Sequence, residues 1–281
     1  MKLIIANWKM NSSFNEIGPW LQNYLKAVSE NVEPLNEKRI VICPPFHLIE
    51  FIDSELSNAS VTFLKSELEK EDKKIEDLSE DEVNEFIMSS RALSLGAQDC
   101  HHEQNGAYTG DISAKMISEI GCEFVIIGHS ERRIYHKESD KKISKKFLAA
   151  IENSIQPILC VGESSEIRKE GKHLEYITSQ LINSIPQDKK FVNIVIAYGP
   201  IWSIGTGKTP TIQELSEMSQ HIKSTLSEKM SDKFENLYIV YGGSININNS
   251  NQLMNAPGID GLLVGKASLD SEQFCKIIGL K

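Results

Sequence analysis

Eight short apolar runs recur along the chain, and they constrain its fold more than any other feature. Most are separated by stretches with apolar residues three and four positions apart, as at Ile143, Phe147 and Ile151, which is the spacing of an amphipathic helix. Strands without strict alternation, each followed by a helix, predict a parallel sheet covered by helices, and eight such units fit a closed (β/α)8 barrel. The predicted strands are residues 3–6, 40–43, 93–97, 124–127, 157–161, 194–197, 237–241 and 261–264.

A charged segment at residues 65–90 interrupts the alternation of predicted strands and helices before the third strand. It reads KSELEKEDKKIEDLSEDEVNEFIMSS, a pattern that predicts a solvated helical insertion on the outside of the barrel, with a docking surface for a partner as the alternative. Leu78 could pair with Val83, Phe86 or Ile87 to give a weak apolar stripe, so part of the segment is expected to pack. The 281 residues are predicted to form a single α/β domain, 1–281, with an insertion at 65–90.

Charge and cysteine usage exclude several classes of partner. The formal net charge is -9, which argues against nucleic acid and anionic membrane as partners. No eighteen apolar residues run together, as a membrane span would need. The five cysteines are spread widely and form no CxxC pair, which indicates reduced thiols in a cytoplasmic protein.

Two of the predicted strands end in residues suited to catalysis. The first is followed by Asn7, Trp8 and Lys9, and the fourth by Gly128 and His129. Active sites of such barrels lie at the carboxyl ends of the strands. A lysine there could balance a phosphate or a developing oxyanion, and an imidazole could polarise a carbonyl. Each residue alone is equally compatible with a structural role.

Three later loops are rich in glycine. The sixth strand leads into a segment with Gly205 and Gly207, the seventh into Gly242, Gly243 and Ser244, and the eighth into Gly265 and Lys266. Loops after strands seven and eight are where barrels of this kind commonly bind phosphate through backbone N–H groups. The loop after strand six offers mobile N–H groups that could fold over an anion. Together the three loops favour a phosphate site.

These motifs, in this order and spacing, resemble the triosephosphate isomerase family. The segments that carry the resemblance are NWKMN at 7–11, GHSERR at 128–133, IGTGKT at 204–209, YGGS at 241–244 and DGLLVG at 260–265. Further matches at 43–46, 106–110 and 159–163 extend it along the chain apart from the charged segment. The resemblance implies a TIM barrel that interconverts dihydroxyacetone phosphate and D-glyceraldehyde 3-phosphate through an enediol(ate), with no cofactor and no metal.

The resemblance also assigns roles to single residues. It places Lys9 and Asn7 beside the substrate oxygens and makes His129 a neutral electrophile. Glu131 matches the acid that holds the lysine. The positions that grip the phosphate are Gly205, Ser244, Gly265 and Lys266, and the last is usually a second glycine in the family. Residues 204–208 match a closing lid.

One catalytic position departs from the family. Where the family has the glutamate that takes the substrate proton, the chain has Gly199, and glycine has no side chain for this task. Glu131 and Glu163 match supporting acids, so neither is an obvious substitute. Isomerase activity is therefore expected to be strongly impaired. Because the remaining motifs are intact, they favour a working enzyme in which only position 199 has been altered. One alternative is a noncatalytic barrel that binds triose phosphate or a protein partner. The other is an error in the sequence.

The resemblance further implies a homodimer. The loop after strand three, 100–110, matches the segment that reaches into the partner's active site, with Thr109 at its tip and Asn11 of the second copy as its expected contact. The adjacent His101 and His102 lack a third metal ligand in sequence and are interpreted as loop residues. Cys160 is interpreted as a packed thiol, because nothing cationic flanks it in sequence.

Overall fold

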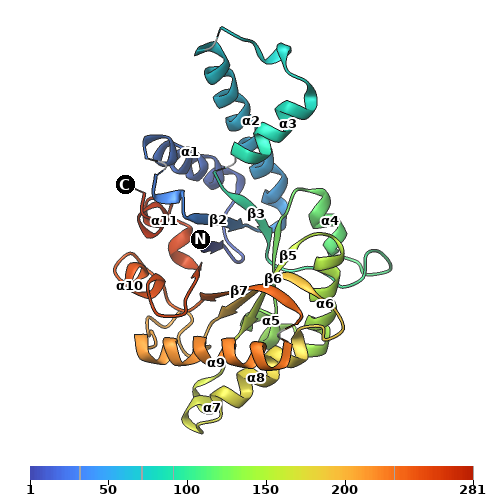
Figure 1. Cartoon of the computed structure of the whole chain (residues 1–281), viewed down its shortest axis with the longest axis vertical. Coiled ribbons are helices and arrows are strands. Elements are labelled where there is room, and N and C mark those ends of the chain that lie inside the picture. The colour runs from blue at the N-terminus through green and yellow to red at the C-terminus, as the bar shows by residue number, and fades with distance from the viewer. Residues whose placement is uncertain (32, 71, 91, 231, 281) are drawn as a thin grey trace.

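Eight parallel strands close into a barrel in the computed structural model, which describes residues 1–31, 33–70, 72–90, 92–230 and 232–280. Figure 1 shows the strands at the centre of the main body with helices around them. The predicted fold class is therefore confirmed. The strands are β1 (Lys2–Asn7), β2 (Lys38–Cys43), β3 (Ser94–Ala97), β4 (Phe124–Ile127), β5 (Gln156–Val161), β6 (Phe191–Tyr198), β7 (Phe234–Tyr241) and β8 (Gly261–Val264).

The strands bury both of their faces, which explains why their sequences lack polar alternation. Leu3 and Ile5 of β1 belong to a cluster inside the barrel, whereas Ile4 and Ala6 belong to the cluster beneath the helices. The barrel closes where Leu3 pairs with Gly261. A Cβ atom at Gly261 would lie 1.8 Å from the carbonyl oxygen of Leu3, so only glycine allows this approach.

Helices follow the strands and cover the outside of the barrel (Figure 1). None in the described ranges is long and apolar enough to cross a membrane. The α-helices are α1 (Phe14–Glu30), α2 (Phe46–Lys70), α3 (Glu80–Ser90), α4 (Ala114–Glu119), α5 (Ser130–Tyr135), α6 (Asp140–Glu152), α7 (Ser165–Lys169), α8 (His173–Ser184), α9 (Ile212–Met230), α10 (Ser250–Met254) and α11 (Ser271–Ile278), with short 3₁₀ turns η1 (Glu33–Leu35), η2 (Ile75–Asp77) and η3 (Lys266–Ser268).

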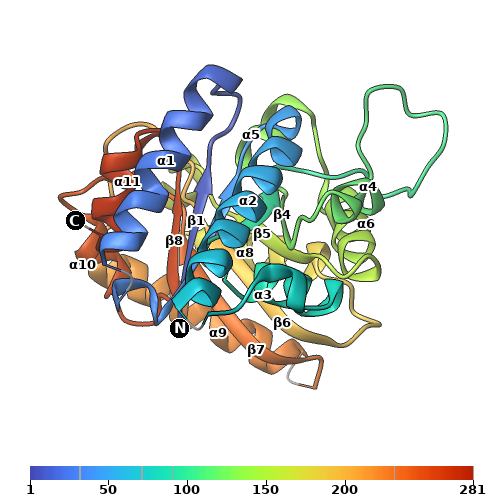
Figure 2. The same cartoon turned by 90° about the horizontal axis from the view of Figure 1, so that it is seen from above.

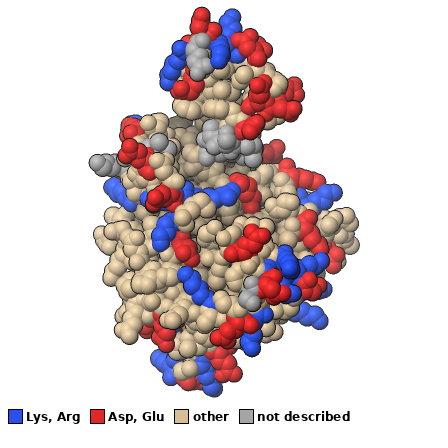
Figure 3. All heavy atoms as spheres, viewed as in Figure 1, with Lys and Arg blue, Asp and Glu red and all other residues tan. Residues whose placement is uncertain are grey.

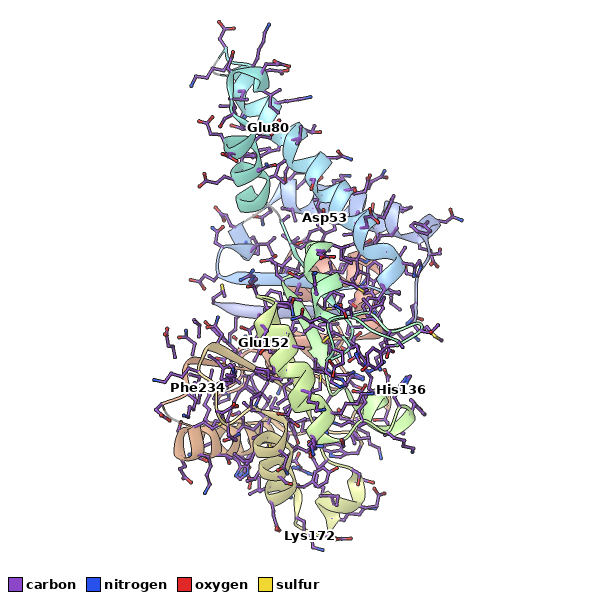
Figure 4. All side chains as sticks on the ribbon, turned by 90° about the vertical axis from the view of Figure 1, so that its right-hand side faces the viewer. Asp53, Glu80, His136, Glu152, Lys172 and Phe234 are labelled. Atoms are coloured by element: carbon purple, nitrogen blue, oxygen red, sulfur yellow. The ribbon has the colours of Figure 1, made fainter. Side chains whose placement is uncertain are left out.

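The charged segment 65–90 forms the end of α2, η2 and α3, apart from residue 71, which lies outside the described residues. The two helices project from the barrel (Figure 1), with Asp53 closer to the barrel and Glu80 farther out (Figure 4). Side chains of both charge signs cover the projection (Figure 3). The rings of Phe63 and Phe86 stack with centroids 6.1 Å apart, so the helices pack on each other. The single-domain division stays a prediction.

A buried network of charges lies between the barrel and its helices near the end of β3. Lys146 of α6 is only 1% exposed, and its Nζ lies 2.6 Å from Asp99 Oδ1 and 2.6 Å from Glu138 Oε1. Arg132 of α5 contacts the same two carboxylates at 2.8 and 3.0 Å. Two cations and two anions therefore balance where water is excluded, and they tie α5 and α6 to the end of β3.

Candidate active site

Lys9 is held in an unusual backbone conformation just beyond the end of β1. Its φ angle is 54°, a left-handed value that residues with a side chain adopt only where their surroundings enforce it. The side-chain oxygen of Asn7 accepts a hydrogen bond from the Lys9 N–H at 3.0 Å, and Gln98 Nε2 donates to the Lys9 carbonyl at 2.7 Å. These two hydrogen bonds hold the backbone of Lys9 in place and so fix the position of its Cα atom, from which the side chain extends.

The Lys9 ammonium group lies 2.5 Å from Glu131 Oε1. Glu131 follows His129 at the start of α5, and its other oxygen lies 3.3 Å from His129 Nδ1. The carboxylate therefore pairs with the lysine after β1 and lies beside the histidine after β4. The structure brings together Lys9, His129 and Glu131, three of the charged or titratable residues that the motifs singled out.

The tautomer of His129 follows from its hydrogen bonding. Its Nδ1 accepts a hydrogen bond from the backbone N–H of Glu131 at 3.3 Å, so in the neutral ring the proton is on Nε2. Burial lowers the pKa of His129 to about 4, with Glu131 opposing the shift and Lys9 and Arg132 reinforcing it. His129 is therefore a neutral imidazole at physiological pH that can donate from Nε2.

This lowered pKa makes folding stability depend on pH in a defined window. Between pH 6.5 and about 4 the unfolded chain protonates His129 while the folded chain does not, so stability should fall as pH decreases through this range. At pH 5 the loss should be about 2 kcal/mol. Urea unfolding at pH 7.5 and 5.0 should show this extra loss in the natural chain and not in His129→Gln. An equal pH effect in both proteins would contradict the assignment.

A cleft of about 480 Å³ opens at the carboxyl ends of the strands. The glycine-rich loops that the sequence singled out also line it, and a Cβ atom built at Gly265 would lie 3.8 Å from Lys9 Cε. Lys266 begins η3, is exposed to the cleft, and no ion pair joins it to an acid among the described residues. The predicted site residues that line the cleft are Asn7, Lys9, His129, Gly205, Ser244, Gly265 and Lys266.

The loop after β6 lies over this cleft and is attached to the loop after β7. Ser244 Oγ donates to the Ser203 carbonyl at 2.6 Å and accepts from the Gly207 N–H at 3.2 Å. Ser203 Oγ in turn contacts the Tyr241 hydroxyl at 2.8 Å and the Lys208 carbonyl at 2.7 Å. Residues 203–208 are therefore held over the cleft by the segment that carries Ser244.

A buried carboxylate supports the start of this loop. Glu163 is fully buried, and its oxygens accept hydrogen bonds from the Tyr198 hydroxyl at 3.2 Å and from Trp202 Nε1 at 3.0 Å. Arg168 lies 3.2 Å away and balances its charge. Glu163 is thus fully engaged in holding the end of β6.

Gly199 follows β6 and does not line the large cleft. It lines a neighbouring cavity of about 20 Å³. A Cβ atom built there would lie 3.1 Å from the Gly242 carbonyl oxygen and 3.5 Å from Ile204 Cδ1. With Glu131 paired to Lys9 and Glu163 buried, neither of the two acids that the motifs single out is free to act from this position.

Thr109 lies apart from the cleft. Its loop projects from the barrel before α4 (Figure 2), and residues 103–111 are exposed. His101 and His102 lie at its base with their rings tilted by 34° and the ring centroids 4.4 Å apart. No group of three or more metal-ligating side chains that could hold an ion occurs in the described part of the chain.

Three residues that shape the site were missed from the sequence. Gln98 fixes the Lys9 backbone, and Ser203 and Tyr241 hold the loop over the cleft. Burial raises the pKa of Tyr241 to about 12, although its hydrogen bond with Ser203 opposes the shift, so the phenol stays protonated. The position of Gln98, Ser203 and Tyr241 at strand ends and loop starts was the available signal in the sequence. Side-chain amides and hydroxyls are too common at such positions for this signal to be specific.

Fold and site together define a closed parallel α/β barrel with a polar cleft at the carboxyl ends of its strands, which is where barrel enzymes carry their active sites. A sequence model of the family described as triosephosphate isomerase matches residues 2–73 and 78–281. The chain therefore belongs to the triosephosphate isomerase family, as its motifs predicted, and at the level of the family it is an isomerase.

Individual relatives agree along nearly the full chain. The triosephosphate isomerase of Aquifex aeolicus is 37% identical over 278 residues, covering 99% of this chain and 98% of that protein. That of Thermoanaerobacter sp. is 38% identical over 282 residues, covering 98% of each. The crystal structure of triosephosphate isomerase from Bartonella henselae superposes with a TM-score of 0.75 at 32% identity, covering 98% of this chain and 97% of that one.

Proposed function

We propose that this cleft is built to interconvert dihydroxyacetone phosphate and D-glyceraldehyde 3-phosphate through an enediol(ate). The observation that carries the proposal is the convergence of Lys9, a neutral His129 and loops rich in glycine on one cleft. Membership of the triosephosphate isomerase family supports it. The reaction moves one proton between adjacent carbons and involves no cofactor or metal.

Negative charge develops on the substrate oxygens when the proton leaves. Lys9 supplies positive charge to them with Asn7 beside it, and the His129 Nε2–H donates a hydrogen bond. A neutral imidazole suits this task because its donor strength is closer to that of an enediol than an imidazolium's would be. Glu131 holds Lys9 in position through the 2.5 Å contact.

The glycine-rich part of the cleft takes the phosphate group. Gly205 and Gly265 offer backbone N–H groups, as does Ser244, whose N–H also lies 3.4 Å from Ser203 Oγ. Lys266, which pairs with no acid among the described residues, adds a cation beside them. The loop that Ser244 holds excludes water from the enediolate. Retaining this phosphate end preserves binding even where the proton transfer is slow.

Proton transfer is the step that this chain performs poorly. The family's base position is Gly199, which carries no side chain. A positioned base contributes typically about 10² to 10⁴ in rate. This chain therefore binds the substrate and stabilises the oxyanion, but its turnover is reduced by about 10² to 10⁴ or more.

The proposed assembly is a homodimer that acts on small triose phosphates in the cytoplasm, with neither nucleic acid nor membrane as a partner. The projecting loop with Thr109 would reach Asn11 of the second copy. Met10, which is 95% exposed, and Tyr108, 45% exposed, place apolar surface on the two segments involved. Large exposed apolar side chains that gather on neighbouring segments are typical of association surfaces.

A noncatalytic binding protein is the second candidate, and Gly199 is the observation that favours it. In that case the cleft would hold triose phosphate without turning it over, and the charged projection formed by the end of α2 and by α3 would contact a protein partner. The two candidates differ in whether the remaining groups can catalyse once a base is supplied.

Binding and turnover measured on the same sample test the proposal. The natural chain should bind dihydroxyacetone phosphate in a calorimeter while isomerising glyceraldehyde 3-phosphate slowly, and Lys9→Ala should lose most of both because the cation is gone. Absence of binding to the natural chain would overturn the proposal. A high rate in the natural chain would instead show that Gly199 does not mark the missing base.

A further inference from the structure

The cavity beside Gly199 is larger than a single water requires. Its volume is about 20 Å³, whereas one water needs about 10–15 Å³. Gly199 lines it without a side chain, and a Cβ atom built there would lie 3.5 Å from Ile204 Cδ1 and 3.1 Å from the Gly242 carbonyl oxygen, two residues that also line the cavity. The cavity therefore fits a polar molecule slightly larger than water.

The lining of this cavity favours a small anion. The His129 ring lines it, and Nε2 is the nitrogen left to donate. Ser130 also lines it, and its hydroxyl has no hydrogen-bond partner in the described part of the chain. The Arg133 guanidinium forms part of the wall and donates to the carbonyls of Gly128 and Cys160 at 2.8 and 3.3 Å. Three polar side chains, one of them a cation, thus line part of the empty space beside the apolar Val161, Ala197 and Leu263, and Asp140 balances part of the arginine charge.

The cavity adjoins the substrate cleft. His129, Ile204, Gly242 and Leu263 line both spaces. With no Cβ at Gly199, no side chain of that residue stands between them. A small ligand in the cavity therefore lies next to the groups that would act on a triose phosphate.

We propose that the cavity beside Gly199 binds a small monocarboxylate, of the size of formate, and that this carboxylate serves as the base for proton transfer. The inference rests on the proposed function. The bound carboxylate takes the proton from the carbon next to the carbonyl, and the C–H electron pair forms the C=C bond of the enediolate. The carbonyl π electrons move to the oxygen beside Lys9 and His129. The hydroxyl proton on the oxygen of the deprotonated carbon passes to the first oxygen, and the electrons it leaves form the new C=O bond. The C=C electron pair meanwhile takes the proton of the carboxylic acid at the former carbonyl carbon, so the carboxylate is regenerated.

Size sets the selectivity among carboxylates. Formate has three non-hydrogen atoms, acetate four and propionate five, and a cavity of about 20 Å³ leaves little room beyond the first. Rate enhancement should therefore decrease from formate to acetate and vanish with propionate. Simple proton transfer by a base in bulk solvent would instead follow basicity and favour acetate and propionate over formate.

The test is the rate of glyceraldehyde 3-phosphate isomerisation against formate concentration, with chloride keeping the ionic strength constant. The natural chain should gain at least about tenfold and approach saturation, since a bound base acts with a high effective concentration. Ser130→Ala should need more formate for the same gain because it lacks the free hydroxyl. Gly199→Glu should not respond, because its own side chain fills the site.

Thermal unfolding gives a readout that does not depend on turnover. Formate should raise the unfolding temperature of the natural chain above the chloride control and leave that of Gly199→Glu unchanged, as expected for a ligand that binds the folded state. If Gly199→Glu is active but formate changes neither the rate nor the unfolding temperature of the natural chain, this inference is overturned and the proposed function stays intact. An inactive Gly199→Glu together with an absent formate effect would overturn both.

Discussion

Replacing Gly199 with glutamate should raise the isomerisation rate at least about a thousandfold, within the range that a positioned general base contributes. The other groups in the proposed mechanism are already in place. Lys9 is fixed by Asn7, Gln98 and Glu131, and His129 is neutral with its Nε2–H free to donate. The variant therefore adds the one group that the mechanism lacks. Steady-state rates of the two proteins, compared at equal concentration of folded protein, measure the gain.

The backbone at position 199 can accept a side chain. Its φ lies outside the left-handed region, and the nearest obstacle to a Cβ atom is the Gly242 carbonyl oxygen at 3.1 Å, which must give way by a few tenths of an ångström. Beyond the Cβ lies the cavity of about 20 Å³ that adjoins the substrate cleft. A glutamate side chain that follows this path brings its carboxylate to the boundary between the two spaces.

Gly199→Gln is the matched control, because it fills the same space without a basic group. It should stay as slow as the natural chain. If glutamine and glutamate gave equal gains, the effect would come from packing, and Gly199 would not mark a missing base. If Gly199→Glu folded and bound triose phosphate without turning it over, the noncatalytic candidate would be preferred.

The strands could be predicted from the sequence because burial on both faces leaves an uninterrupted apolar run. Residues 124–127 and 261–264 match β4 and β8 at both ends. β6 and β7 start earlier than predicted, at Phe191 and Phe234. Polar residues interrupt their apolar runs there, and the side chains of Asn193 and Asn236 hydrogen-bond to each other across the two strands at 3.0 Å. A pair formed between strands gives no signal in either strand alone.

The candidate site was predictable where a residue type follows directly from a strand end, as with Lys9 and His129. What the sequence did not indicate depends on contacts between distant segments. The left-handed backbone of Lys9 needs Gln98, which is 89 positions away. The attachment of the loop over the cleft needs Ser203 to meet both Tyr241 and the segment at Ser244.

The buried charge network was missed for a different reason. Lys146 is one of several lysines in α6, and such residues are normally assigned to solvent. Its spacing relative to Ile143 and Ala150 places it on the buried side of that helix. That spacing was the available signal, but its partner Asp99 is 47 positions away. Only the fold brings the two charges together.

Replacing Lys146 with methionine should reduce the free energy of unfolding by about 3–5 kcal/mol. Methionine has a similar length, so the change removes the charge and leaves the volume nearly constant. Asp99 and Glu138 then share Arg132 as their only cation in this buried network, and one buried negative charge is left without compensation. Urea unfolding at one fixed protein concentration, which keeps any contribution from the proposed assembly constant, measures the loss.

Lys145→Met is the matched control, since it makes the same change at the neighbouring, exposed position of α6; its effect should stay within about 0.5 kcal/mol. Adding Asp99→Asn to Lys146→Met restores charge balance in the buried network. The double variant should therefore be more stable than Lys146→Met alone, because Arg132 and Glu138 remain as a neutral pair at 3.0 Å. If the two substitutions were instead additive, the stabilising role of Lys146 would come from packing and not from its charge.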